Sequence, residues 1–130
     1  MSPLLFVYGT LMRSSQLEQA IYLRNHADYL STGWIPGRLY DAGGYPGLQE
    51  LETYTDWVYG EIYQMHEPER LLSRLDAYEE ATDAFPSPQE YKRKEAELLN
   101  DKGKICLCHV YYYQWPVTDL ALISKGIWRL

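Results

Sequence analysis

The stretch that most constrains this chain is Leu4-Leu5-Phe6-Val7-Tyr8-Gly9-Thr10-Leu11-Met12. Its continuous apolar run, Leu4 to Val7, is typical of a strand that is buried on both faces. The run breaks at Gly9, where a glycine allows backbone angles that other residues avoid and lets N–H groups come close to a ligand. Such a turn can hold an anion or a carbonyl oxygen. From the residues alone, a first strand and an ordinary turn explain the same pattern.

Length and charge limit the architecture and the partners. The 130 residues are expected to form a single domain, 1–130, with a core large enough to hold a pocket. The net charge of −6 argues against nucleic acid and against an anionic membrane surface as partners. No apolar run approaches the ~20 residues of a membrane-spanning helix, and the N-terminus lacks a signal-peptide pattern. We therefore expect a cytoplasmic protein.

The cysteine and histidine residues predict neither a disulfide nor a metal site. Cys106 and Cys108 stand one residue apart in an apolar run, and the three histidines are scattered. Two thiols without further ligands do not make a zinc site, so we expect reduced, packed cysteines. The 13 tyrosines suit the wall of a barrel or cleft that must both pack and form hydrogen bonds.

The first half of the chain predicts one helix and several extended segments. Ser15 and Glu18 have the spacing of a capping box, which predicts a helix over about 15–25 with Leu17, Ala20 and Ile21 on its apolar face. Extended segments are expected at 29–35 and 38–40, separated by Pro36-Gly37, followed by a glycine-rich loop at 41–47 that presents Tyr45.

The second half predicts a strand, a helix and a hairpin. The strand covers 57–65, and we expect its Glu61 on a solvated face, the alternative being a half-buried acid between tyrosines. Pro68 begins the helix, with an apolar stripe of Leu71, Leu72, Leu75 and Tyr78. A surface loop at 81–89 and strands at 90–99 and 105–115, joined by a turn at 100–103, complete the pattern.

The end of the second helix is acidic. Asp76 stands three residues before Glu79 and four before Glu80, so these side chains can neighbour one another on one helical flank. Like charges and partial burial raise the proton affinity of a carboxylate toward the range of a general acid or base. A solvated acidic helix end is the alternative by spacing alone.

These elements predict an α+β fold. Hairpins outnumber crossover units, which favours a mixed, mostly antiparallel sheet curled into a small barrel with a few flanking helices. The Gly9 turn is not followed by a dinucleotide-binding or P-loop pattern, so we expect no nucleotide cofactor.

Five short motifs in order resemble the gamma-glutamylcyclotransferase-like family, which includes the gamma-glutamylamine cyclotransferases. They span nearly the whole chain: Val7-Tyr8-Gly9-Thr10-Leu11, Gly44-Tyr45-Pro46-Gly47, Val58-Tyr59-Gly60-Glu61-Ile62-Tyr63, Leu75-Asp76-Ala77-Tyr78-Glu79 and Tyr91-Lys92-Arg93. The resemblance implies a small fold around a barrel-like sheet. It also implies cleavage of a γ-glutamyl amide by cyclisation to 5-oxoproline, with release of an amine and without a cofactor or metal.

The resemblance also implies roles for particular residues. Glu79 looks like the catalytic carboxylate, which first accepts and then donates a proton. The turn Tyr8-Gly9-Thr10-Leu11 looks like the substrate loop, Tyr45 would line the cavity, and Arg93 would lie beside it as a structural or charge-balancing group. Ile127 stands where many relatives have an acid before the tryptophan, which puts in doubt a role for the C-terminus in the site.

Two alternatives from other classes remain open. A binding module would hold a small glutamyl-like ligand in the same pocket without turnover. A scaffold protein would use its aromatic surface, and its Gly9 turn and Glu79 would lie apart with no cavity between them. The enzyme hypothesis predicts that this turn and Glu79 face a common pocket.

Overall fold

A computed structural model of the chain describes residues 1–79 and 89–129. The apolar run near the start forms β1 (Leu4–Val7), which pairs antiparallel with β4 (Trp57–Met65) and parallel with β6 (Ile105–Tyr113). The side chains of β1 alternate between two cores: Leu5 and Val7 pack toward the helices, and Phe6 packs inside the barrel. The prediction of a first strand that is buried on both faces is therefore confirmed.

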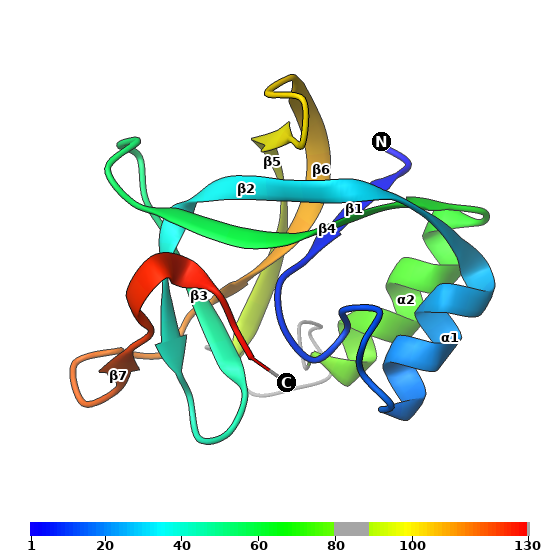
Figure 1. The fold of residues 1–130 in the computed structure, drawn as a ribbon. Helices are drawn as coiled ribbons and strands as arrows, with labels where there is room; N and C mark the ends of the chain where they lie inside the picture. Colours follow the sequence, from blue (N-terminus) through cyan, green and yellow to red (C-terminus); the bar gives the residue numbers. More distant parts are fainter. Residues whose placement is uncertain (80–88, 130) are drawn as a thin grey trace.

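The sheet closes into a barrel, as the sequence predicts. Its order is β3-β2-β4-β1-β6-β5, and β2 (Ala27–Asp41) also pairs with β5 (Tyr91–Asn100). Five strands thus close on themselves, while β3 (Pro46–Glu50) and β7 (Ala121–Leu122) extend the other end of β2 (Figure 1). A 3₁₀ turn, Ser124–Gly126, follows β7.

The expected interruption at Pro36-Gly37 is wrong, because β2 runs through it. Residues 27–36 of β2 pair with β4, and residues 37–41 pair with β3. Pro36 is the last residue paired with β4, where a missing N–H is tolerated because the strand changes its partner there. A Cβ on Gly37 would lie 2.6 Å from Leu48 Cδ1, so glycine lets β3 approach.

The capping-box prediction is also wrong. Helix α1 spans Glu18–His26 and has no side-chain cap, because the Ser15 hydroxyl accepts a hydrogen bond from the N–H of Leu17, outside the helix. Leu17 and Ile21 are exposed, and the buried residues are Ala20 and Leu23. The second helix, α2 (Pro68–Tyr78), begins at its proline as predicted, and its three leucines are buried.

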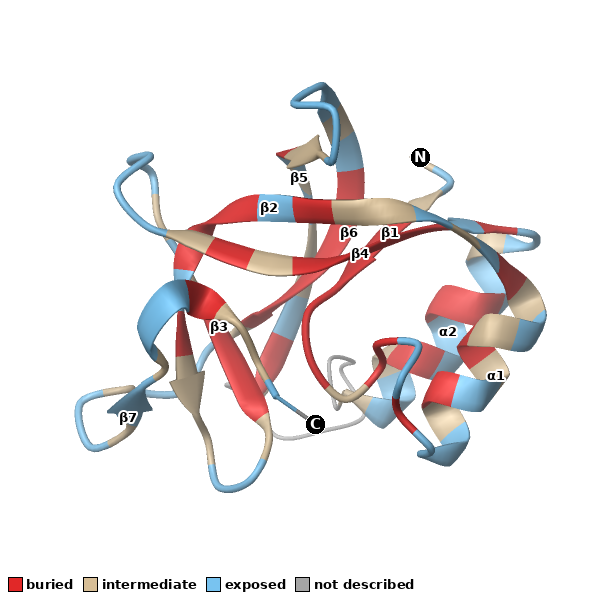
Figure 2. Ribbon diagram, in the orientation of Figure 1, coloured by how far each residue is buried: buried red, intermediate tan, exposed pale blue. Residues whose placement is uncertain are grey.

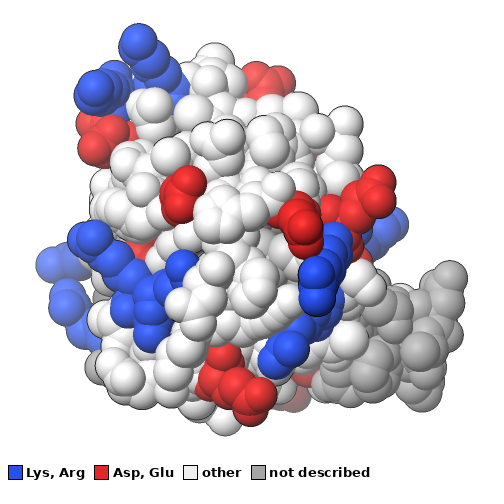
Figure 3. Space-filling view, turned by 90° about the vertical axis from the view of Figure 1, so that its right-hand side faces the viewer, with Lys and Arg blue, Asp and Glu red and all other residues white. Residues whose placement is uncertain are grey.

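The two helices lie side by side against one end of the sheet, and the buried positions gather between them and inside the barrel (Figures 1 and 2). The outer face of the helices carries acidic and basic side chains interspersed, without a continuous surface of one sign (Figure 3). No helix within residues 1–79 and 89–129 is long and apolar enough to cross a membrane.

Strand β4 has the predicted bounds, but Glu61 is buried and not solvated. Its carboxylate accepts hydrogen bonds from the N–H of Arg13 at 2.7 Å and from the hydroxyl of Tyr63 at 3.3 Å. A buried carboxylate needs such donors, and one of them comes from the turn after β1. Glu61 therefore fixes the end of that turn.

Candidate active site

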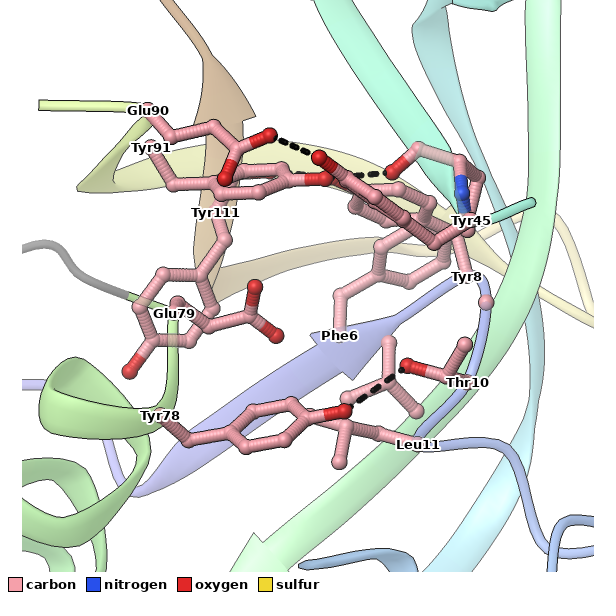
Figure 4. Close-up of a pocket in the computed structure, with 13 residues that line it drawn as sticks. Phe6, Tyr8, Thr10, Leu11, Tyr45, Tyr78, Glu79, Glu90, Tyr91 and Tyr111 are labelled. Carbon is pink, nitrogen blue, oxygen red and sulfur yellow. Dashed lines mark hydrogen bonds between the residues drawn. The ribbon is translucent and has the colours of Figure 1, made fainter. Parts of the chain in front are cut away.

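A cavity of about 280 Å³ opens where the turn after β1 meets β3, the end of α2 and the start of β5 (Figure 4). It brings together all of the predicted site residues except Arg93: Tyr8, Gly9, Thr10, Leu11, Tyr45 and Glu79. The arrangement that the enzyme hypothesis requires, with the Gly9 turn and Glu79 facing one pocket, is therefore present. A scaffold in which the two lie apart does not fit this geometry.

Gly9 is required by space and not by an unusual backbone angle. A Cβ at this position would lie 2.2 Å from Cγ of Pro46, and Gly9 is not among the glycines with positive φ. The turn closes with a hydrogen bond from Met12 N–H to the carbonyl of Gly9. Within the described part of the chain, the N–H groups of Gly9, Thr10 and Leu11 donate to no other group.

Glu79 directly follows Tyr78, the last residue of α2, and points into the cavity (Figure 4). Its N–H donates to the carbonyl of Leu75 at 2.8 Å, which holds it on the last turn of the helix. Burial raises the pKa of the Glu79 carboxyl to about 8, and the charge of Glu90 adds to this increase. Of the two acids expected beside it, Asp76 is engaged elsewhere, and Glu80 lies outside the described residues.

Glu90 is a functional candidate that the sequence analysis missed. It is 7% exposed, lines the cavity, and accepts a hydrogen bond from the hydroxyl of Tyr45. No helical or strand spacing links Glu90 to Glu79, because the two belong to different elements. The available signal was an acid directly before the Tyr91-Lys92-Arg93 motif.

Tyrosines form much of the cavity wall. The hydroxyl of Tyr8 donates to the carbonyl of Tyr111 at 2.6 Å, and that of Tyr91 donates to the carbonyl of Pro46 at 2.7 Å. Burial raises the pKa of both phenols well above the ordinary value, so they remain donors at neutral pH. Tyr78 differs, since it is 39% exposed and its oxygen lies 3.5 Å from Thr10 Oγ1. Thr10 and Tyr78 both line the cavity, so a ligand there can reach these two hydroxyls.

Arg93 lies behind the wall and does not line the cavity. Its guanidinium binds both carboxylate oxygens of Asp76, at 2.8 and 3.1 Å, and its Nη1 lies 2.9 Å from Nδ1 of His109. Asp76 also accepts a hydrogen bond from the hydroxyl of Tyr111, a wall residue. The geometry therefore places Arg93 where it balances the charge of Asp76, and it does not place it against a substrate.

No cluster of three or more His, Cys, Asp or Glu side chains suited to a metal ion occurs in the described residues. Burial raises the pKa of the Cys108 thiol to about 12, so it is a protonated, packed side chain. The chemistry that the cavity offers is that of one carboxylate of raised proton affinity facing a turn of backbone N–H donors.

The family model described as "Gamma-glutamyl cyclotransferase, AIG2-like" matches residues 5–130. The chain belongs to this family. A relative from Vibrio cholerae is 32% identical to this chain, in a match that covers 98% of this chain and 96% of the relative. That relative is named "Putative gamma-glutamylcyclotransferase".

Two solved structures are similar in fold to this chain. An AIG2-like protein from Mus musculus has a TM-score of 0.71 and 26% identity, covering 94% of this chain and 86% of its own. YkqA from Bacillus subtilis has the same TM-score and identity. That match covers 98% of this chain but 40% of YkqA, so this chain spans less than half of that protein's length.

Proposed function

We propose that this protein is an enzyme that cleaves a γ-glutamyl amide, forming 5-oxoproline and releasing an amine. The observation that carries the proposal is that Glu79 and the Gly9 turn line one cavity. Membership of the gamma-glutamyl cyclotransferase, AIG2-like family and the name of the Vibrio cholerae relative support a cyclotransferase-type activity.

The turn after β1 is suited to the negative end of such a substrate. The N–H groups of Gly9, Thr10 and Leu11 have no acceptor in the described chain and can hold the α-carboxylate or the developing oxyanion. The hydroxyls of Thr10 and Tyr78 add two neutral donors at the same side of the cavity (Figure 4). Glu79, across from this turn, attracts the α-ammonium group.

Glu79 then passes two protons, one after the other, from the attacking nitrogen to the leaving nitrogen. Its carboxylate takes the first proton from the α-ammonium, and the freed amine attacks the γ-carbonyl carbon to form the ring C–N bond and an oxyanion. Glu79 gives this proton to the leaving nitrogen and takes the second proton from the ring nitrogen. The oxyanion then re-forms the carbonyl, the old C–N bond breaks with its electron pair going to the leaving nitrogen, and the released amine takes the second proton from Glu79. Nucleophile and electrophile belong to one molecule, so the cavity mainly has to hold a folded conformer. Substrate and Glu79 supply every proton and electron pair, so this route uses no cofactor.

The raised pKa of Glu79 suits both steps. A carboxyl with a pKa of about 8 accepts a proton from an ammonium more readily than an ordinary carboxylate does, and still returns it to a leaving amine. General acid–base catalysis of this kind contributes about 10²–10⁴ in rate.

The test is release of 5-oxoproline from γ-glutamyl amino acids, γ-glutamyl-ε-lysine and simple γ-glutamyl amines. Glu79→Gln keeps the shape and removes the proton transfer, so we expect a loss of at least about 10² in kcat. Glu69→Gln, on the exposed side of the same helix, is the matched control and should retain activity. If wild type releases nothing while a γ-glutamyl compound raises its Tm, the protein is a binding module.

A further inference from the structure

The proposed reaction leaves one buried histidine without a role. His109 lies on β6 and is 2% exposed, yet it does not line the cavity. Both of its ring nitrogens have a partner: Nδ1 lies 2.9 Å from Nη1 of Arg93, and Nε2 lies 3.0 Å from the carbonyl oxygen of Ser2. A buried imidazole with a partner on each nitrogen is held in one orientation.

These partners determine where the proton of His109 lies. A guanidinium only donates, so Nδ1 accepts from Arg93 and the proton is on Nε2, which donates to Ser2. Burial, with the charge of Arg93, lowers the pKa of His109, which agrees with a neutral ring. Glu95 has its Oε1 3.8 Å from Nε2, too far to accept this hydrogen bond. His109 is therefore a neutral acceptor for Arg93.

This acceptor sets the direction of the Arg93 guanidinium. The Nε and Nη2 atoms of Arg93 donate to the two carboxylate oxygens of Asp76, and its Nη1 donates to His109. The guanidinium is planar and rigid, so a partner at Nη1 also fixes the two N–H groups that face Asp76. Without His109 as acceptor, the group can tilt and break the paired contact with Asp76.

Asp76 connects this pair to Glu79. It lies on the last turn of α2, three residues before Glu79, and its Oδ1 also accepts the hydroxyl of Tyr111 at 2.6 Å. Asp76 therefore attaches the end of α2 to Arg93 on β5 and to Tyr111 on β6. Tyr111 and Glu79 line the same cavity (Figure 4). The place of Glu79 in the cavity depends on this attachment.

We propose that His109 is a positioning residue that holds Glu79 in its buried place through Arg93 and Asp76. This inference rests on the proposed function, and it adds a residue that does not touch the substrate. Burial is the main cause of the raised pKa of Glu79, so movement of the end of α2 toward water lowers that pKa. The pH dependence of activity therefore reports whether the attachment is intact.

Two substitutions separate the two hydrogen bonds of His109. His109→Asn has its amide oxygen near the place of Nδ1, so it can accept from Arg93 but loses the bond to Ser2. His109→Gln has its amide near the place of Nε2, so it can donate to Ser2 but loses the acceptor for Arg93. The proposal requires the first variant to resemble wild type and the second to be impaired.

The measurement is 5-oxoproline release as a function of pH, with the γ-glutamyl amide that wild type cleaves best. We expect His109→Gln to lose at least about tenfold in kcat, because a misplacement of about 1 Å at the reacting groups can cost about 10² in rate. Its midpoint in kcat/KM should fall below the wild-type value of about 8. His109→Asn should keep that midpoint and most of the activity.

A role in packing alone gives a different result. The side chain of Gln is closer in volume to that of His than Asn is, so lost packing would harm His109→Asn more. Such a loss lowers Tm without moving the midpoint. His66→Gln is the matched control, because His66 is an exposed histidine whose ring binds Asp28, and it should change neither kcat nor the midpoint.

The inference is overturned if folded His109→Gln keeps the wild-type midpoint, or if His109→Asn lowers it as much as His109→Gln does. Should His109→Gln not fold, Arg93→Lys replaces it, because one ammonium cannot bind both oxygens of Asp76 and His109 in this geometry. An unchanged midpoint in Arg93→Lys also overturns the inference.

Failure of the proposed function looks different. Wild type would then release 5-oxoproline from no γ-glutamyl amide. Urea unfolding as a function of pH still reports the pKa of Glu79 without turnover. The same order is expected there: His109→Asn like wild type, and His109→Gln with a lower pKa of Glu79. Equal pH dependence in all three proteins would overturn the inference.

Discussion

The surroundings of Glu79 change its proton affinity, and this predicts how activity depends on pH. Burial, with a further contribution from Glu90, raises its pKa to about 8. A general base acts in its ionised form, so kcat/KM should rise with pH and level off above about 8. In Glu90→Gln the midpoint should move to lower pH, because a repelling charge is gone, whereas Glu97→Gln, at an exposed acid on β5, should not move it. A wild-type midpoint near the ordinary 4.5 would contradict the burial of this carboxyl.

The same shift predicts a pH-dependent stability. Glu79 has a folded-state pKa above its unfolded value, so the folded protein binds the extra proton between pH 4.5 and about 8. Wild type therefore loses stability as pH rises through this interval, while Glu79→Gln, which cannot ionise, does not. Urea unfolding should show similar stabilities at pH 4.5 or below and a more stable variant, by a few kcal/mol, above pH 8. A constant difference at all pH values would be inconsistent with this account.

Individual residues differ in how far the sequence reveals them. Glu79 was identified because it ends the motif Leu75-Asp76-Ala77-Tyr78-Glu79, which resembles the family, whereas spacing alone left a solvated helix end as the alternative. Glu90 was missed because its neighbour Glu79 belongs to another element. Glu61 was misjudged for the same reason, since the N–H that binds it belongs to Arg13, 48 residues away in the chain. Local pattern identifies an acid, but only the fold shows which donors and charges surround it.

Among the elements, the turn after β1 depends on its contact with the start of β3. Gly9→Ala would place a Cβ 2.2 Å from Cγ and 2.9 Å from Cδ of Pro46, so one of the two segments must move. Because the turn lines the cavity, we expect Gly9→Ala to lose most activity and about 1–3 kcal/mol of stability.

A second substitution tests the cause of that loss. Pro46→Ala removes both clashing atoms and leaves the Cβ at 3.6 Å, so the double variant Gly9→Ala/Pro46→Ala should regain stability and part of the 5-oxoproline release. The single variant Pro46→Ala is the control, because it shows how much the loss of the proline itself alters stability and activity near Tyr45. If the double variant is no better than Gly9→Ala, the glycine is required for another reason.

Elements were predicted well where one pattern covers a whole element, as in β1, β4 and α2. They were predicted poorly where a residue's role depends on tertiary contacts and not on the local sequence. Ser15 bonds the N–H of Leu17 before α1 begins, and Pro36 lies where β2 exchanges β4 for β3. Neither fact is visible locally, because each depends on where the neighbouring segment lies.

For the whole molecule, strand-rich hairpin patterns predicted the barrel but not how it closes. Closure depends on two residue pairs between β2 and β5: Gly33 with Asn100, and Trp34 with Leu99. These partners are far apart in sequence and follow no repeating pattern. A Cβ at Gly33 would lie 2.8 Å from the carbonyl oxygen of Leu99 and 2.9 Å from Cδ1 of Ile62. Glycine there lets the two strands approach.

Gly33→Ala should therefore weaken the pairing between β2 and β5 that closes the barrel. The added methyl meets the backbone of β5 and a core side chain, so we expect a loss of about 1–3 kcal/mol in urea unfolding. Amide hydrogen exchange should become faster first in the part of β5 around Leu99, because β2 and β5 are joined there by two residue pairs alone. Gly103→Ala, in the turn between β5 and β6, is the control. A Cβ at this position would meet no atom within 4 Å, but the residue has a φ of 73°. The variant should therefore lose about 1 kcal/mol of stability without a clash between β2 and β5. If both variants change exchange around Leu99 equally, strain at the nearby turn and not closure through Gly33 governs that edge of β5.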